Sequence, residues 1–212
     1  RTATLLPKVE LHTHLDCNLS FDAVSQLRPG IERETYEKEF VSREKFTDLA
    51  DFLKIIDSSL DLMQTEKGLQ IVTQDLFRQY KEDNVIYAEV RFAPLLHLRD
   101  GLTPEQVLRI VEKAVDKYAV ETGVDSRLIL CTLRHFNKDQ SMETVRLAET
   151  FKGSRVVGLD ISADEAGFPI DAHIGTFRFA FEKGIYRTAH AGEARGPDSV
   201  RETLEYFKPT RI

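Results

Sequence analysis

The sequence has few cysteines and no long apolar run, and both absences limit what the protein can be. Only Cys17 and Cys131 occur in 212 residues, far apart and in no CxxC arrangement, which argues against a disulfide framework or a thiolate zinc site. No apolar run approaches the roughly 18 residues that cross a bilayer, and the first ten residues lack the pattern of a secretory leader. We therefore expect a cytoplasmic protein without a membrane partner, in which histidine and carboxylate hold any metal.

An excess of basic residues is also lacking. Lysine and arginine number 29 against 35 aspartates and glutamates, which gives a net charge of −6 without long runs of one sign. Such a chain has no electrostatic footprint for a phosphate backbone, so nucleic acid is not expected as a partner. Hydrophobic residues make up 42% and charged residues 30%, which is ordinary for a globular chain and excludes collagen and disordered tails. These counts leave the oligomeric state open.

Short apolar segments with β-branched residues alternate with helical patterns along the chain. Parallel strands need a crossover of a dozen or more residues, so this alternation predicts an α/β fold with a parallel sheet. The predicted strands are 8–15, 85–93, 128–133, 155–161 and 185–189. Helical patterns cover 21–27, 32–40, 48–63, 142–151, 174–183 and 198–207, together with two helices that follow the capping residues Thr65 and Thr103.

Charges inside the predicted strands distinguish an open doubly wound sheet from a (β/α)8 barrel. Strand alternation puts Glu10, His12 and His14 on one face of the first strand. An open sheet covered by helices would bury such charges against apolar surfaces at high cost, whereas a barrel lumen lets acids and bases from different strands meet. We therefore expect a (β/α)8 (TIM) barrel. The charges expected in its lumen are Glu10, Glu89, Arg91, Arg134 and Asp160.

The barrel is expected to be incomplete within this chain and to carry a lid. A complete barrel typically takes about 250 residues, and residues 209–212 resemble the start of a sixth strand. We thus expect one metal-dependent hydrolase domain over 1–212, truncated at the start of strand six. Residues 16–84 separate the first two predicted strands, where 2 to 6 residues are usual, which predicts a helical lid inserted after strand one.

Histidines at the ends of two predicted strands indicate a metal site. In His12-Thr13-His14 the two imidazoles lie on one strand face, close enough to share a metal. The fifth predicted strand ends at His190, and Glu193 follows three positions later. Barrel active sites lie at this end of the strands. Three imidazoles, a further ligand and a water would form a hydrolytic site, although an exposed loop glutamate alone is ordinarily only solvated.

Five segments together resemble the adenosine deaminase family of metal-dependent amidohydrolases. They are LPKVELHTHLD at 6–16, YAEVRFAPL at 87–95, LILCTLRH at 128–135, VVGLDISADEAGFP at 156–169 and TAHAGEARGP at 188–197. The resemblance implies a (β/α)8 barrel that binds one Zn²⁺ through His12, His14, His190 and an aspartate of the eighth strand. It also implies hydrolytic deamination of adenosine and 2′-deoxyadenosine to inosine and ammonia, a reaction of purine metabolism.

The resemblance further implies how a purine nucleoside binds. Asp16 would hold the ribose hydroxyl groups, Glu193 would exchange a proton with ring N1, and the backbone near Ala163 would meet the purine. The chain departs from the family where it has Cys17 and Ala163, since the family usually has glycine at both positions. Alanine keeps the backbone N–H but lacks the freedom of glycine at positive φ. The family's remaining metal ligand would follow residue 212.

Some other residues have two interpretations or a structural one. Leu49, Phe52 and Leu53 recur at helical spacing, and this face can either belong to the core or cover the purine pocket. His97 and His173 stand in loop or helix-start contexts, where we expect solvated side chains.

Alternatives to adenosine deamination stay open at this stage. One is a deaminase of a related 6-aminopurine, such as adenine or a modified nucleoside. Another is a catalytically silent barrel that lacks the last ligands. A barrel phosphoesterase fits poorly, because nothing beside His12 and Glu193 supplies the extra ligands of a two-metal site.

Overall fold

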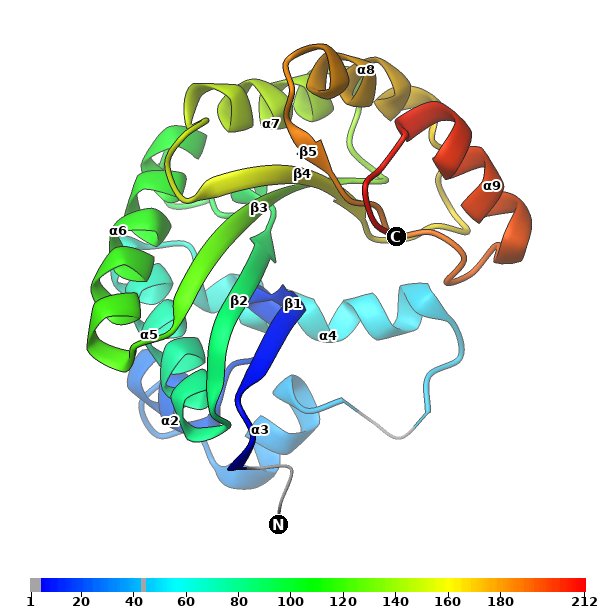
Figure 1. Cartoon of the computed structure of the whole chain (residues 1–212). Coiled ribbons are helices and arrows are strands. Elements are labelled where there is room, and N and C mark those ends of the chain that lie inside the picture. The colour runs from blue at the N-terminus through cyan, green and yellow to red at the C-terminus, as the bar shows by residue number, and fades with distance from the viewer. Residues whose placement is uncertain (1–4, 43–44) are drawn as a thin grey trace. The chain divides into compact units, whose positions relative to one another are not determined.

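The computed structural model describes residues 5–42 and 45–212 and has an α/β fold (Figure 1). Five strands form one sheet in the order β1-β2-β3-β4-β5, and the pairings of β1 with β2 and of β4 with β5 are parallel. The predicted parallel α/β arrangement is therefore confirmed. The strands are β1 (Lys8–His14), β2 (Val85–Phe92), β3 (Asp125–Leu133), β4 (Val156–Ser162) and β5 (Tyr186–Arg187).

Helices occupy the predicted positions between the strands. The α-helices are α2 (Phe21–Leu27), α3 (Arg33–Phe40), α4 (Leu49–Leu62), α5 (Glu66–Glu82), α6 (Pro104–Thr122), α7 (Lys138–Thr150), α8 (Ile174–Glu182) and α9 (Gly196–Phe207). Short 3₁₀ helices are η1 (Leu15–Cys17), η2 (Pro94–Leu96) and η3 (Asp171–His173). Helix α7 begins four residues before the predicted start, because Asn137 and Gln140 form a capping box there. No helix of the described residues is long and apolar enough to cross a membrane.

The chain divides into two compact units, and the first covers residues 1–42 and 55–128. Its helices begin where the sequence supplies caps: the Thr65 hydroxyl accepts from the Gly68 amide, and Thr103 forms a capping box with Gln106. Each such cap stabilises the fold by about 1 kcal/mol. Helices α5 and α6 bury one face each, and the buried side chains include Leu69, Val72, Leu76, Val107, Val111 and Val115.

The second unit covers residues 43–54 and 129–212. Strands β3 and β4 supply most of its buried strand residues, and the Phe177 and Phe207 rings from α8 and α9 stack with centroids 3.9 Å apart. Gly158 lies where a side chain would meet backbone, because an added Cβ would be 3.2 Å from the Tyr186 carbonyl oxygen. Glycine here lets β5 lie close to β4. The expectation of a single domain over 1–212 stays a prediction.

Candidate metal and substrate site

His12 and His14 lie on β1, and a β-bulge precedes the end of this strand. Glu10 pairs with Ala88 and Thr13 with Val90, so β1 has one residue more than β2 in this interval. A bulge re-aims side chains and is common beside active sites. The Arg91 guanidinium, which is buried, donates to the Leu11 carbonyl at 2.8 Å inside the bulge.

The two histidine rings are close to each other. Their centroids lie 5.5 Å apart, tilted by 48°, and the His12 amide donates to Glu10 Oε1 at 2.7 Å. His12 is exposed and His14 is half-buried. The predicted side-by-side placement of the two imidazoles therefore holds within β1.

Asp16 is buried, but not on the strand. Strand β1 ends at His14, and Asp16 lies in η1 with 7% of its surface exposed. Burial raises the pKa of its carboxyl group, with hydrogen bonds opposing this effect. Asp16 does not cap the following helix α2. The Ser20 hydroxyl is the cap: it accepts a hydrogen bond from the Ala23 amide and donates one to Asp75. Oδ1 of Asp16 instead accepts from the Cys17 thiol at 3.5 Å.

His190 follows β5 and is held by neighbours in the second unit. Its amide donates to the Ile161 carbonyl at 2.9 Å, and its Nδ1 lies 2.9 Å from Oδ2 of Asp160. Asp160 is fully buried and also accepts from the Thr188 hydroxyl at 3.0 Å. Arg134 Nη2 donates to the His190 carbonyl at 3.0 Å. These contacts hold the backbone of His190 and place the Asp160 carboxylate beside its ring.

Glu193 is exposed in the turn between β5 and α9. Buried Glu165 holds this turn, since it accepts hydrogen bonds from the amides of Gly192, Ala194 and Arg195. No pattern in the sequence assigns a role to Glu165. Its signature in sequence is weak, because Asp164 and Glu165 are adjacent acids in one loop and nothing in their order shows which of them is buried.

Glu165 stays ionised in spite of its burial. Burial alone would raise its pKa, but hydrogen bonds from the Ser199 hydroxyl and the turn amides outweigh it and lower the pKa to about 2. Arg134 Nη2 lies 3.7 Å from Glu165 Oε1. Arg134 is one of the charges expected in the lumen. Its acidic partner Glu165 comes from the loop between β4 and α8 and was not among those expected charges.

Ala163 adopts a backbone conformation that favours glycine. Its φ is +79°, in the region that L-residues enter only with strain. This explains why the resembling family usually has glycine here. The amide of Ala163 is thereby presented as a glycine amide would be, at an energetic cost.

Leu49, Phe52 and Leu53 lie on α4, and all three are half-buried. The Phe52 ring meets Phe46 edge-on, with centroids 5.2 Å apart. A role of this face in covering a purine stays a prediction.

The expectation that His97 and His173 are solvated is wrong. Both side chains are completely buried, because each has hydrogen-bond partners in the interior. His97 Nδ1 lies 3.1 Å from the Met63 carbonyl oxygen. His173 lies 2.9 Å from the Ser141 hydroxyl through Nδ1 and 3.1 Å from the Arg134 carbonyl through Nε2.

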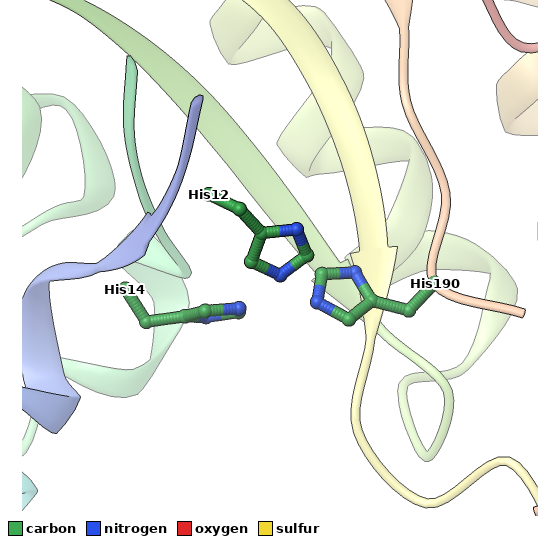
Figure 2. A group of neighbouring side chains, drawn as sticks. All are labelled: His12, His14 and His190. Atoms are coloured by element: carbon green, nitrogen blue, oxygen red, sulfur yellow. The ribbon is translucent and has the colours of Figure 1, made fainter. Parts of the chain in front are cut away.

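Figure 2 shows the imidazoles of His12, His14 and His190, each of which offers one ring nitrogen to a metal ion. Imidazole nitrogen is a preferred ligand of zinc, and catalytic zinc sites commonly have three protein ligands. An outer carboxylate beside a metal-binding histidine is also typical of such sites, and Asp160 lies in such a position beside His190. The donor set of these residues therefore fits a zinc ion.

Comparison with known proteins gives consistent matches along the chain. The family model described as adenosine deaminase matches residues 7–212. An adenosine deaminase of Clostridium kluyveri is 32% identical over 215 residues, which cover 98% of this chain and 62% of that protein. This chain thus spans less than two thirds of that relative's length.

Solved structures have the same fold. The crystal structure of an adenine deaminase from Arthrobacter aurescens is 27% identical, with a TM-score of 0.83 over 97% of this chain and 64% of that one. An amidohydrolase from Burkholderia ambifaria, solved with bound zinc, is 23% identical, with a TM-score of 0.88 over 99% of this chain and 58% of that one. The α/β fold with five parallel strands is thus that of TIM-barrel amidohydrolases. The chain belongs to the adenosine deaminase family of the amidohydrolases.

Proposed function

We propose that the protein is a zinc-dependent aminohydrolase that converts adenosine and 2′-deoxyadenosine to inosine and ammonia. The observation that carries this proposal is the pair His12 and His14 on one strand, together with a third histidine, His190, whose Nδ1 faces a buried carboxylate. Two units of the chain thus supply the ligand type that a mononuclear hydrolytic zinc site requires. The family of the chain supports deamination of a 6-aminopurine.

His12, His14 and His190 would hold the zinc ion as neutral imidazoles. A bound zinc ion supplies a Lewis acid that makes a water molecule nucleophilic near neutral pH. The Asp160 carboxylate, 2.9 Å from Nδ1 of His190, would favour Nε2 as the ligand nitrogen.

Glu193 would act as the proton donor to ring N1 of the purine. Protonation at N1 makes C6 more electrophilic, so that attack at C6 and departure of ammonia become easier. The exposed Glu193 side chain, on a turn whose amides Glu165 holds, supports this role. The backbone amide at Ala163 would meet the purine, and the half-buried face of Leu49, Phe52 and Leu53 would cover it.

Asp16 would select a nucleoside over a free base. A carboxylate accepts hydrogen bonds from ribose hydroxyl groups and repels a 5′-phosphate. Burial of Asp16 supports this, since a buried acceptor left unpaired by the wrong ligand can discriminate by factors on the order of 10⁴. The alternative is a 6-aminopurine without the sugar, and the similar adenine deaminase from Arthrobacter aurescens favours keeping it in the test. A cytoplasmic location and a small-molecule purine nucleoside as substrate, with neither nucleic acid nor a membrane as a partner, complete the proposal.

A substrate panel tests the proposal. We expect adenosine and 2′-deoxyadenosine to be deaminated, adenine poorly and AMP hardly at all, as followed by ammonia release. Asp16→Asn should lower kcat/KM for adenosine while leaving that for adenine nearly unchanged. Comparable kcat/KM values for adenosine and adenine in the unchanged protein would mean that Asp16 does not read the sugar, and the assignment to a nucleoside would fall. Absence of turnover with all four purines would contradict the deaminase function.

A further inference from the structure

Glu165 lies outside the set of residues proposed to meet zinc or substrate, and it has four donors. Oε1 accepts from the Gly192 amide at 2.7 Å and from the Ser199 hydroxyl. Oε2 accepts from the amides of Ala194 at 2.5 Å and Arg195 at 3.1 Å. Only 1% of the Glu165 surface is exposed. One buried carboxylate therefore satisfies three backbone N–H groups of a single turn and a hydroxyl in the first turn of α9.

The donors flank Glu193 on both sides. The amides of Thr188 and His190 still donate to carbonyls of β4, but residues 192–195 lie beyond this ladder and before α9, and their amides donate to Glu165 instead. The turn is also tight: Gly192 has φ +84°, and an added Cβ would lie 2.7 Å from Val200 Cγ2. The backbone on either side of Glu193 is thus fixed to the same side chain.

The negative charge of Glu165 matters to this arrangement. A carboxylate offers acceptor sites on both oxygens, and each receives two donors here. A carboxamide would turn its NH₂ group toward two donors and lose both bonds. Arg134 Nη2 lies 3.7 Å from Glu165 and donates to the His190 carbonyl, so the same cluster reaches the backbone of His190.

We infer that Glu165 is a positioning residue for the reaction: as an anion it holds the turn 192–195 so that Glu193 is presented in one orientation to the substrate ring. Its part in the reaction rests on the proposed function, whereas its hold on the turn does not. General acids act only within hydrogen-bond reach of the proton acceptor. A misplacement of about 1 Å can cost about 100-fold in rate.

The test compares Glu165→Gln with Glu202→Gln. Glu202 is a matched control, because it lies on α9 and accepts from the Arg195 side chain at 3.1 Å without bonding the turn amides. Glu165→Gln should keep its zinc. The amide hydrogens of residues 191–196 should exchange about tenfold faster, relative to those of α7. The kcat for adenosine should fall about 100-fold, with KM within about threefold of that of the unchanged protein. Glu202→Gln should match the unchanged protein in all four quantities.

The outcomes separate this inference from the proposed function. Unchanged exchange in the turn, or unchanged kcat in a zinc-loaded Glu165→Gln variant, overturns the inference. If that variant does not fold, Ser199→Ala is tested in its place, since it removes one donor and leaves the carboxylate. Several-fold faster amide hydrogen exchange in the turn together with a lower kcat supports the inference. An exchange rate or a kcat equal to that of the unchanged protein overturns it. If the unchanged protein deaminates no 6-aminopurine, the proposed function fails and with it the catalytic part. In that case the rate of amide hydrogen exchange still tests whether Glu165 holds the turn.

Discussion

Oδ2 of Asp160 lies 2.9 Å from Nδ1 of His190, which places a buried carboxylate beside one ring nitrogen of a proposed metal ligand. An imidazole that donates through Nδ1 to a carboxylate keeps the lone pair on Nε2. Asp160 is fully buried on β4 and is fixed in turn by the Thr188 hydroxyl. The orientation of His190 is therefore determined by the interior of the second unit.

Asp160→Asn should weaken zinc binding about 10- to 100-fold, because outer-shell partners of metal-binding histidines contribute on that scale. A competition titration with a chromophoric chelator measures the effect. Asp171→Asn is the control, since Asp171 is exposed on η3. Equal zinc affinities for both variants would show that the Asp160 contact does not support a ligand.

Glu193→Gln should retain zinc and lose about 10²- to 10⁴-fold in kcat, since the amide cannot donate a proton to N1 and no metal ligand changes. His190→Ala should instead lose the metal. Elemental analysis together with steady-state kinetics separates the two effects. A Glu193→Gln variant with most of its kcat would reassign the proton donor.

Ala163→Gly should raise the free energy of unfolding by roughly 0.5–1 kcal/mol. Relief of the strain at φ +79° exceeds the entropy that glycine adds to the unfolded chain. Ala166→Gly, at an exposed position of the same loop that is not among the positive-φ residues, should lower it slightly. Urea unfolding of both variants gives the comparison. A loss of stability in Ala163→Gly would mean that the alanine methyl group contributes packing that outweighs the strain.

His97 should make stability depend on pH. Burial, opposed by the hydrogen bond to Met63, lowers its pKa from 6.5 to about 4. The neutral ring is favoured in the folded state, so its contribution is complete above pH 6.5 and falls by about 3 kcal/mol as the pH drops to about 4. The His97→Asn variant cannot ionise at this position, so its free energy of unfolding, measured by urea titration at several pH values, should lack this part of the pH dependence. Parallel curves for the two proteins would contradict the assignment.

Most of the fold could be predicted from the sequence, because its determinants are local. Thr65, Thr103 and the apolar periodicity that follows them define α5 and α6 without reference to the rest of the chain. The last strand shows the limit of this reasoning. The predicted strand 185–189 is assigned only as Tyr186–Arg187, although the amides of Thr188 and His190 still donate to carbonyls of β4.

The candidate site was less predictable where tertiary partners decide. His97 and His173 have no local sequence feature that marks them as buried, because their partners lie 34, 32 and 39 residues away. The bulge in β1 depends on pairing with β2, and the role of Glu165 depends on amides 27 to 30 residues later. The histidines themselves could be found, since strand alternation alone puts His12 beside His14.

The dependence of adenosine deamination on zinc is the direct test of a zinc-dependent aminohydrolase. The measurement is the rate of conversion of adenosine to inosine, followed by ultraviolet absorbance, before and after zinc is removed with a chelator and after zinc is restored. Turnover should be lost with the metal and return when zinc is added, and His190→Ala should stay inactive throughout. Turnover that survives complete removal of zinc, or a zinc-loaded protein that leaves adenosine unchanged, would contradict it.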